Sequence, residues 1–237
     1  MKKQRFWEID ALRGFAIINM IIFNYSFALK YLGILDIDLG LNYAVAIAST
    51  FIFLSGISMT LSYNKSSKDF HKKFSLRGLK IFGWGLIITI ITFLAFPEAF
   101  VIFGILHFIG ISIILGQFFL KFKKINILLG LLIIFLGIYL QTFRFDFPWL
   151  LWLGFSPTYF YTFDYFPILP WFGVTLLGIF CGNWLYKKGK RSFKLKDLSD
   201  FSVVKLLTLL GRKSLFIYLV HQPLLIFILL LLGFRLF

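Results

Sequence analysis

The sequence predicts an all-α, polytopic integral membrane protein, a helical bundle of about seven transmembrane helices with a cytoplasmic N-terminus. Three observations support this fold class. First, 59% of the residues are hydrophobic and only 15% are charged, whereas a soluble domain carries roughly 25% charged residues. Second, several apolar runs reach the roughly 20 residues that a helix needs to cross about 30 Å of hydrocarbon. Third, the cations collect in alternate connections between these runs. We treat residues 1–237 as a single transmembrane domain.

Seven apolar segments meet or approach the length of a membrane span. They are Ala11–Gly33, Leu41–Tyr63, Gly78–Phe96, Ala99–Leu120, Ile125–Leu140, Ile168–Tyr186 and Leu215–Leu232. Because unpaired backbone groups are costly in lipid, only helices or a closed barrel can span a bilayer, and these runs are too long and too continuously apolar for barrel strands. The fifth segment is the shortest, and it spans only if residues 141–145 lie at the interface. The first segment is too long for the apolar region of a signal peptide, so we expect a retained helix.

The positive charge lies at the N-terminus and after the second, fourth and sixth segments. All of the 25 Lys and Arg residues fall there except Arg13, Lys30, Arg144 and Arg235. The positive-inside rule therefore places these connections in the cytoplasm and the C-terminus outside. Membrane topology accounts for the net charge of +15, so we expect no nucleic-acid partner. The chain is predicted to be a multi-pass protein of the cell membrane, in contact with its lipids.

Two stretches between the spans have their own character. Within Lys187–Ser214, apolar residues alternate with cations, which favours a short amphipathic helix in the inner interface over a simple loop. Gln141–Pro167, on the outer side, is crowded with aromatic residues. Such residues collect at membrane interfaces for their amphipathic rings alone. The alternative is a lid or platform for a ligand such as a sugar ring, with Asp146, Asp164 and Arg144 as polar contacts.

The first span carries polar residues on one face. Ionisable residues cost about 2.5–3.5 kcal/mol at the centre of a membrane helix, so each is a functional candidate. At about 100° per residue, Asp10, Arg13 and Asn24 fall within an arc of roughly 60°. This stripe would run from the cytoplasmic surface towards mid-membrane. The alternative is an Asp10–Arg13 pair that only anchors the helix end.

Two histidines are predicted to lie deep in the membrane. At the helical rise, His107 is about 12 Å from the outer side and His221 about 9 Å from the inner side. Either imidazole could act as a general acid or base, or could be a neutral group bonded to a neighbouring helix. We favour His221, because Tyr218 and Gln222 share its helical face and Pro223 loosens the helix there.

The remaining polar residues carry weaker signals. Ser55 and Ser58 share a face of the second span beside Gly56, where small residues more often serve close helix packing. His71 lies in a basic loop, and we expect it to be solvated. Cys181 is the single cysteine, which excludes a disulfide framework and a cysteine-based metal site. We expect no metal cofactor.

Three stretches together resemble a known family. They are the opening RFWEIDALRGFAIINMIIFNY, the middle FGILHFIGISIIL and the closing GRKSLFIYLVHQPLL. In this order they resemble the membrane acyltransferase superfamily, and most closely its branch named for the heparan-α-glucosaminide N-acetyltransferase catalytic domain, including uncharacterised prokaryotic members. The resemblance implies an enzyme that moves an acyl group from cytoplasmic acyl-CoA to a sugar amine or hydroxyl at the outer side. The acyl group that it implies first is acetyl.

The resemblance also assigns residues. Asp10, Arg13 and Gly14 match the opening motif, and Tyr218 and His221 match the closing one. His107 matches a position of the prokaryotic branch. Two positions depart from relatives: Asn24 stands where the related O-acyltransferases have a histidine, and residues 32–42 lack the histidine that the heparan enzyme has after its first motif helix.

The resulting hypothesis gives each site residue a role. Arg13, Asp10, Ser55, Ser58 and Tyr218 would contact the acyl-CoA, with Arg13 holding its phosphates by charge. His221 or His107 would act as the general base, and Asn24 would donate a hydrogen bond to the developing oxyanion. We expect a polar cavity that reaches mid-membrane and is lined by Arg13, Asn24, His107 and His221.

Other readings of the same residues stay open. A small-solute transporter or channel would line its pathway with the same intramembrane histidines and amide. A non-catalytic membrane protein could also keep this scaffold. In the acyltransferase reading the partners are acyl-CoA and a glycan or lipid-linked sugar, and a homodimer is left open.

Overall fold

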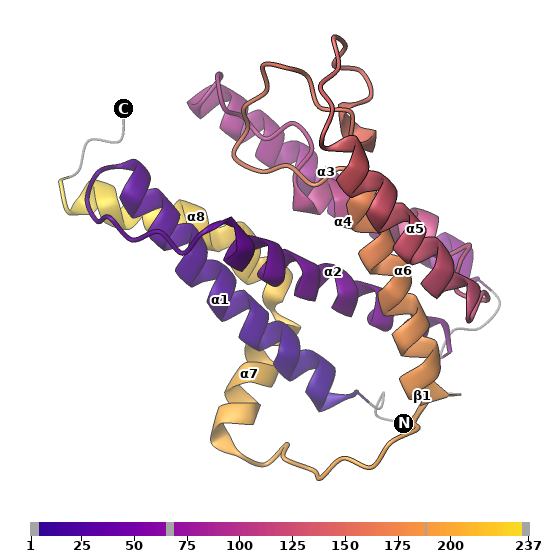
Figure 1. Ribbon diagram of the computed structural model, residues 1–237. Coiled ribbons are helices and arrows are strands. Elements are labelled where there is room, and N and C mark those ends of the chain that lie inside the picture. Colours follow the sequence, from indigo (N-terminus) through magenta and orange to yellow (C-terminus); the bar gives the residue numbers. More distant parts are fainter. Residues whose placement is uncertain (1–4, 65–68, 188, 234–237) are drawn as a thin grey trace. The chain divides into compact units, whose positions relative to one another are not determined.

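The computed structural model describes residues 5–64, 69–187 and 189–233, and in this part the chain is mainly helical (Figure 1). The helices are α1 (Trp7–Tyr31), α2 (Leu41–Tyr63), α3 (Phe70–Ala95), α4 (Ile105–Gly116), α5 (Ile125–Leu140), η1 (Leu151–Leu153), α6 (Ile168–Leu185), α7 (Ser202–Arg212) and α8 (Ser214–Leu231). Two short strands, β1 (Tyr186–Lys187) and β2 (Lys190–Arg191), pair antiparallel. Outside the described residues lie Lys2, Lys3, Lys65, Lys68, Lys188 and Arg235, six of the cations used in the topology prediction.

The predicted fold class, an all-α polytopic membrane protein, is confirmed. In the described part, five helices are long and apolar enough to cross a membrane: α1, α2, α3, α6 and α8. The other two predicted spans form shorter apolar helices, α4 with 12 residues and α5 with 16. Length alone therefore supports five spans of the seven expected.

The fourth predicted span was wrong in extent, because the helix covers only part of Ala99–Leu120. Residues before Ile105 are not helical and lie along part of residues 141–167, the aromatic segment predicted for the outer side and called the outer segment below. The Phe163 N–H donates to the Ala99 carbonyl at 3.0 Å, and the Phe166 N–H donates to the Phe103 carbonyl at 2.9 Å. Pairing with another segment satisfies backbone groups that a helix would otherwise satisfy internally.

The chain divides into two compact units, residues 1–51 with 195–237 and residues 52–194, and α2 contributes to both. In the first unit, α7 packs directly on α1, backbone to backbone (Figure 1). A Cβ on Gly14 would lie 1.9 Å from the Leu207 carbonyl oxygen, and one on Gly211 would lie 1.8 Å from the Asp10 carbonyl oxygen. The helix predicted after Lys187 is therefore present as α7, seated on α1 through two glycines.

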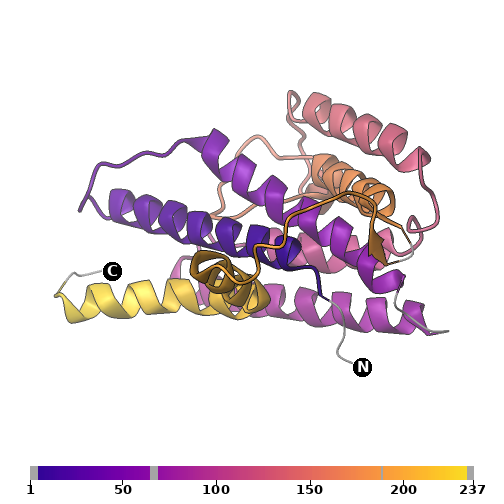
Figure 2. The same ribbon diagram turned by 90° about the horizontal axis from the view of Figure 1, so that it is seen from below.

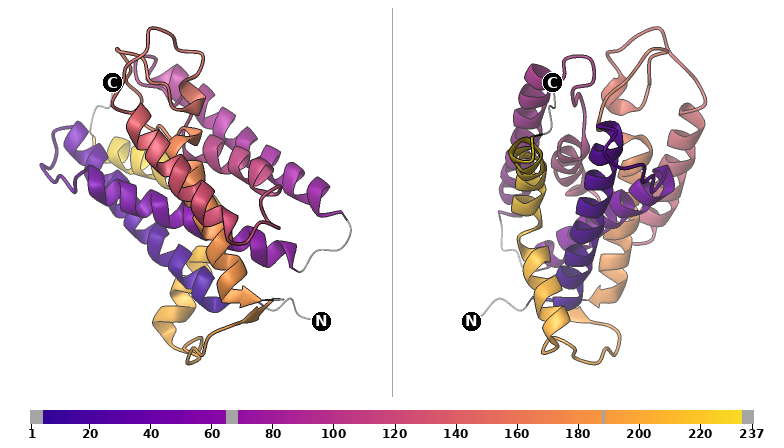
Figure 3. Two further views of the ribbon diagram at one scale, coloured as in Figure 1. Left: turned by 45° about the vertical axis from the view of Figure 1, so that its right-hand side comes forward. Right: turned by 90° about the vertical axis from the view of Figure 1, so that its left-hand side faces the viewer.

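In the second unit, helices also meet at glycines. Figures 2 and 3 show α5 and α6 side by side, and a Cβ on Gly173 of α6 would lie 2.4 Å from the Gly130 carbonyl oxygen of α5. On α2, a Cβ on Gly56 would lie 2.3 Å from the Thr175 carbonyl oxygen of α6. Small residues let membrane helices approach closely enough for van der Waals packing to hold them together.

Candidate functional site

His221 on α8 is buried, and one of its nitrogens has no partner in the part of the chain that the structure describes. Its Nδ1 lies 2.6 Å from the Tyr218 carbonyl oxygen, one turn earlier in the same helix. A carbonyl only accepts hydrogen bonds, so Nδ1 carries the proton and Nε2 of the neutral ring has a free lone pair. His221 is 6% exposed, and its Nε2 has no hydrogen-bond partner among the described residues. The ring is therefore held in the tautomer that can accept a proton at Nε2.

Helix α1 supports this part of α8 through Tyr25 and Asn24. The Tyr25 hydroxyl donates to the His221 carbonyl at 3.0 Å, and the two rings stack with centroids 6.4 Å apart. The Gln222 amide donates to Asn24 Oδ1 at 3.3 Å, and Asn24 Nδ2 donates to the Met20 carbonyl at 2.9 Å. Asn24 thus lies one residue from the tyrosine that contacts His221.

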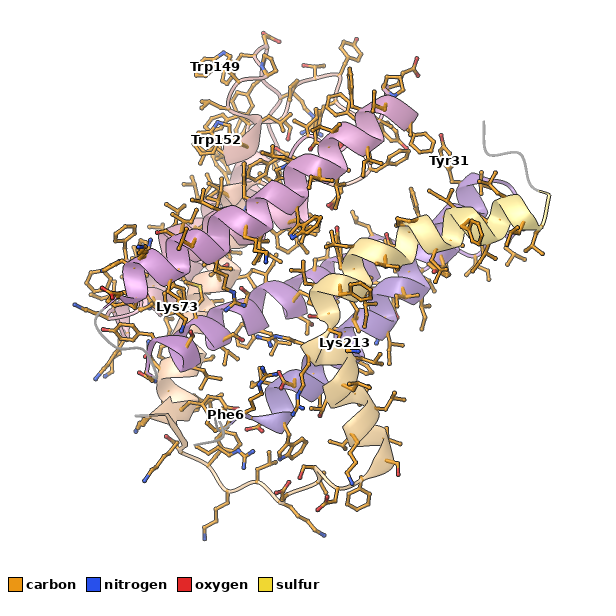
Figure 4. All side chains as sticks on the ribbon, turned by 180° about the vertical axis from the view of Figure 1, so that it is seen from behind. Phe6, Tyr31, Lys73, Trp149, Trp152 and Lys213 are labelled. Carbon is orange, nitrogen blue, oxygen red and sulfur yellow. The ribbon has the colours of Figure 1, made fainter. Side chains whose placement is uncertain are left out.

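The cytoplasm-facing end predicted for α1 carries an ion cluster with α7. Asp10 Oδ1 is 3.4 Å from Arg13 Nη1, and Asp10 Oδ2 is 3.3 Å from Arg212 Nε. Asp10 is buried, whereas the side chains of Arg13 and Arg212 are 22% and 45% exposed. Figure 4 labels Phe6, just before α1 begins, and Lys213, at the junction of α7 with α8. The predicted Asp10–Arg13 pair is present, and Asp10 also pairs with Arg212 of α7.

His107 belongs to the second unit, and both of its nitrogens have partners. The Gly104 N–H donates to its Nδ1 at 3.2 Å, which leaves the ring proton on Nε2, 3.3 Å from Thr89 Oγ1. The Thr89 hydroxyl in turn donates to the Val101 carbonyl at 2.6 Å. His107 therefore closes the first turn of α4, whose N–H groups need acceptors, and it is also supported by Thr89 of α3.

Asp164, considered from sequence as a ligand contact, also serves the start of α4. Its Oδ2 accepts the Ile105 N–H at 2.9 Å. In the same outer segment the Tyr165 hydroxyl donates to the Leu151 carbonyl at 2.8 Å, and burial raises the pKa of this tyrosine, which keeps the hydroxyl a donor. Trp149 and Trp152, which are labelled in Figure 4, belong to the same segment and are exposed.

Ser58, a predicted contact of acyl-CoA, has a local partner. Ser58 Oγ donates to the Leu54 carbonyl at 2.5 Å, within its own helix. Ser55, on the same helix, is half-buried. His71 is exposed, as expected of a solvated residue, but it also bonds Gln117 Oε1 at 3.2 Å and packs against Phe70.

Two residues of the site were missed by sequence reasoning. Arg212 was counted only as a topology-setting cation, although it stands in the closing motif GRKSLFIYLVH, two residues before Ser214. Tyr25 follows Asn24 directly and was not singled out. Its bond to the His221 carbonyl is a tertiary contact with no spacing signal in the sequence. For His107, the glycine three residues earlier was the available sign of a helix N-terminus.

The predicted site residues thus fall into two groups. Asp10, Arg13, Asn24, Tyr218 and His221 lie in the first unit, and Ser55, Ser58 and His107 lie in the second. Each group is described within its own unit, and a single cavity lined by both histidines stays a prediction. Among the described residues, no group of three or more His, Cys, Asp or Glu could hold a metal ion.

Comparison with known families gives a match that covers most of the chain. The model of the family described as heparan-alpha-glucosaminide N-acetyltransferase, catalytic, matches residues 5–223. No curated protein and no solved structure matches the chain. The matched region begins before α1 and ends just after His221. It therefore contains the candidate site residues of the first unit, on α1 and on α8. The chain therefore belongs to the heparan-alpha-glucosaminide N-acetyltransferase catalytic-domain family.

Proposed function

We propose that this membrane protein is an acyltransferase that moves an acetyl or other acyl group from cytoplasmic acyl-CoA to a sugar amine or hydroxyl at the outer side. Membership of the family supports transferase chemistry. The observation that supports the proposal most is the state of His221: its Nδ1–H is bound to the Tyr218 carbonyl, and its buried Nε2 is left with a lone pair. An unpartnered buried polar atom is costly, and a general base needs such an atom.

The chemistry requires one proton to move while one bond forms and one breaks. His221 Nε2 takes the proton from the acceptor amine or hydroxyl as its nitrogen or oxygen attacks the thioester carbon. The carbon–sulfur bond breaks, and the CoA thiolate leaves and takes up the proton from the imidazolium. The Asn24 amide has two N–H donors, of which one binds the Met20 carbonyl. The other is the donor that we assign to the oxyanion.

The test is transfer of label from acetyl-CoA by purified protein in lipid nanodiscs, with glucosamine-terminated and hydroxyl-bearing sugars as acceptors. His221→Ala should lower the rate by about 10² to 10⁴, the usual contribution of a general acid or base, and leave folding and CoA binding in place. His107→Ala is the matched comparison. Because His107 closes α4, its loss should lower thermal stability more than the His221 change does.

The outcomes separate the three classes of function. Normal turnover in His221→Ala contradicts this residue as the base, and normal turnover in both variants ends the histidine-base mechanism. Absence of acetyl-CoA binding, together with solute flux across sealed proteoliposomes, identifies a transporter. A folded wild-type protein with neither activity is a non-catalytic member of the family.

A further inference from the structure

We propose that Tyr25 is a positioning residue for His221: its hydroxyl fixes the backbone of α8 at the imidazole, so that the ring keeps Nε2 unprotonated. The inference deepens the proposed function and rests on it, because His221 is the base that we propose there. Tyr25 acts through His221 and contacts no reacting atom in that scheme. Its loss should therefore change the geometry of the base and leave binding of the acyl donor in place.

Helix α8 is weakened directly after His221. Pro223 lies inside the helix and has no N–H group, so the Leu219 carbonyl receives no hydrogen bond from residue 223. The proline ring also crowds that carbonyl and loosens the helix there. The bond from His221 Nδ1 to the Tyr218 carbonyl lies in this same stretch of α8. The backbone of α8 alone is therefore a weak support for the imidazole.

Two consecutive residues of α1 bind two consecutive residues of α8 at this point. The Tyr25 hydroxyl donates to the His221 carbonyl at 3.0 Å, and the Gln222 amide donates to Asn24 Oδ1 at 3.3 Å. Neighbouring helices commonly supply such contacts where a proline interrupts a membrane helix. Helix α1 thus restrains α8 at the residues just before Pro223.

The ring of Tyr25 also lies along the imidazole of His221. The two rings are nearly parallel, with an interplanar angle of 14° and centroids 6.4 Å apart. Aromatic pairs favour offset stacking at centroid distances of about 4.5–7 Å. The hydroxyl and the ring of Tyr25 therefore restrain two different parts of His221, its carbonyl and its imidazole. Substitution by Phe removes the first restraint and keeps the second.

The alternative is a contact that only holds two helices together, as hydrogen bonds between membrane helices often do. Tyr43 of α2 makes a comparable contact in the same unit, because its hydroxyl donates to Asn19 Oδ1 of α1. Tyr43→Phe removes the same chemical group from a contact with α1 that does not involve His221. It is therefore the matched control for Tyr25→Phe.

The first measurement reports the state of the ring without turnover. The full chain, labelled with a nitrogen isotope in its 3 histidines, is reconstituted in lipid and studied by solid-state NMR at mildly alkaline pH, with His221→Ala to assign the signals. In wild type, His221 should give the pattern of one neutral tautomer protonated at Nδ1, and His107 the opposite pattern, protonated at Nε2. Tyr25→Phe should replace the single His221 pattern with a mixture of both tautomers and leave His107 unchanged. Tyr43→Phe should give the wild-type spectrum.

The second measurement is the rate of acetyl transfer in lipid nanodiscs. A base that spends time in wrong orientations slows the chemical step but does not weaken donor binding. Tyr25→Phe should therefore lower kcat by about threefold to tenfold, as expected for the loss of one hydrogen bond, with the KM for acetyl-CoA unchanged. Tyr25→Leu also loses the ring and should lower kcat further. Tyr43→Phe should keep the wild-type kcat.

The outcomes separate the positioning role from the proposed function. A single Nδ1–H pattern for His221 in Tyr25→Phe, or an unchanged kcat in that variant, overturns the role of Tyr25. If wild type transfers acetyl and kcat falls equally in Tyr25→Phe and Tyr43→Phe, Tyr25 is a structural contact only, while the proposed function stands. If wild type transfers acetyl to none of the sugars but the His221 pattern still changes in Tyr25→Phe, the positioning of the ring stands and the acyltransferase proposal fails.

Discussion

Replacing Gly211 with Ala should separate α7 from α1. The added Cβ would lie 1.8 Å from the Asp10 carbonyl oxygen, whereas real Cβ contacts essentially never fall below 3.0 Å. The Cβ would meet backbone atoms of α1, so no side-chain rotation relieves the clash. The two helices must separate by about 1 Å or become strained locally. Overpacking of this kind costs about 1–3 kcal/mol. Since Arg212 is the next residue, the same displacement should also weaken its contact with Asp10.

The assay is thermal unfolding in detergent, followed by tryptophan fluorescence, with Gly83→Ala as the control. Gly83 lies inside α3, and a Cβ there would meet nothing within 4 Å. That control should be neutral or more stable, because Ala favours a helix interior over Gly by about 0.8–1 kcal/mol. For a chain of this length each kcal/mol shifts the melting temperature by roughly 2–4 °C. A Gly211→Ala protein that melts with or above wild type would show that the contact between α1 and α7 is looser than described.

Two other properties can be measured independently of activity. In a Cys181→Ala background, a cysteine at exposed Lys196 should resist an impermeant maleimide in intact cells and react after lysis, because the basic connections are expected to be cytoplasmic; labelling from outside would reverse the topology. In the loop after α1, the hydrogen bond from Lys30, then that from the Gly40 N–H, lowers the pKa of Asp38. A carboxylate whose pKa is lowered by folding stabilises the fold at pH values above its ordinary pKa of about 3.9. This stabilisation is lost as the pH falls through the pKa of the folded state. Hydrogen exchange of residues 32–40 should therefore speed up below about pH 4 in wild type, whereas Asp38→Asn should exchange fast at neutral pH as well; equal protection of both proteins would exclude the Asp38 contact.

The sequence predicted the long helices well because membrane spans depend on length and hydropathy. Leu41–Tyr63 matches α2 in full, and Leu215–Leu232 differs from α8 by one residue at each end. The start of α4 could not be predicted in this way. Residues 99–103 are apolar enough to continue the helix, but they pair with residues 163–166, and that pairing is a long-range contact that no local pattern encodes.

In the candidate site, too, the local contacts could be predicted and the long-range contacts could not. Helical spacing alone brought Tyr218 close to His221, although it is the carbonyl of Tyr218 rather than its ring that binds the imidazole. Spacing also gave the Asp10–Arg13 pair. It did not give Arg212, because the contact between α1 and α7 depends on two glycines far apart in the chain. Nor did spacing distinguish the histidines, since the partners of His107 are a backbone N–H and a threonine of another helix.

The attachment of the outer segment to α4 has a mechanical consequence. The Asp164 carboxylate accepts the first N–H of α4, and the neighbouring residues are bonded to the strand-like stretch that leads into that helix. A displacement of residues 163–166 would therefore also displace the turn that holds His107. Tyr159, at 97% exposure, lies outside the bonded stretch. Substitutions at Tyr159 can thus change the exposed surface of this segment while leaving the start of α4 intact. Loss of the Asp164 carboxylate, in contrast, would disturb the turn that holds the His107 imidazole.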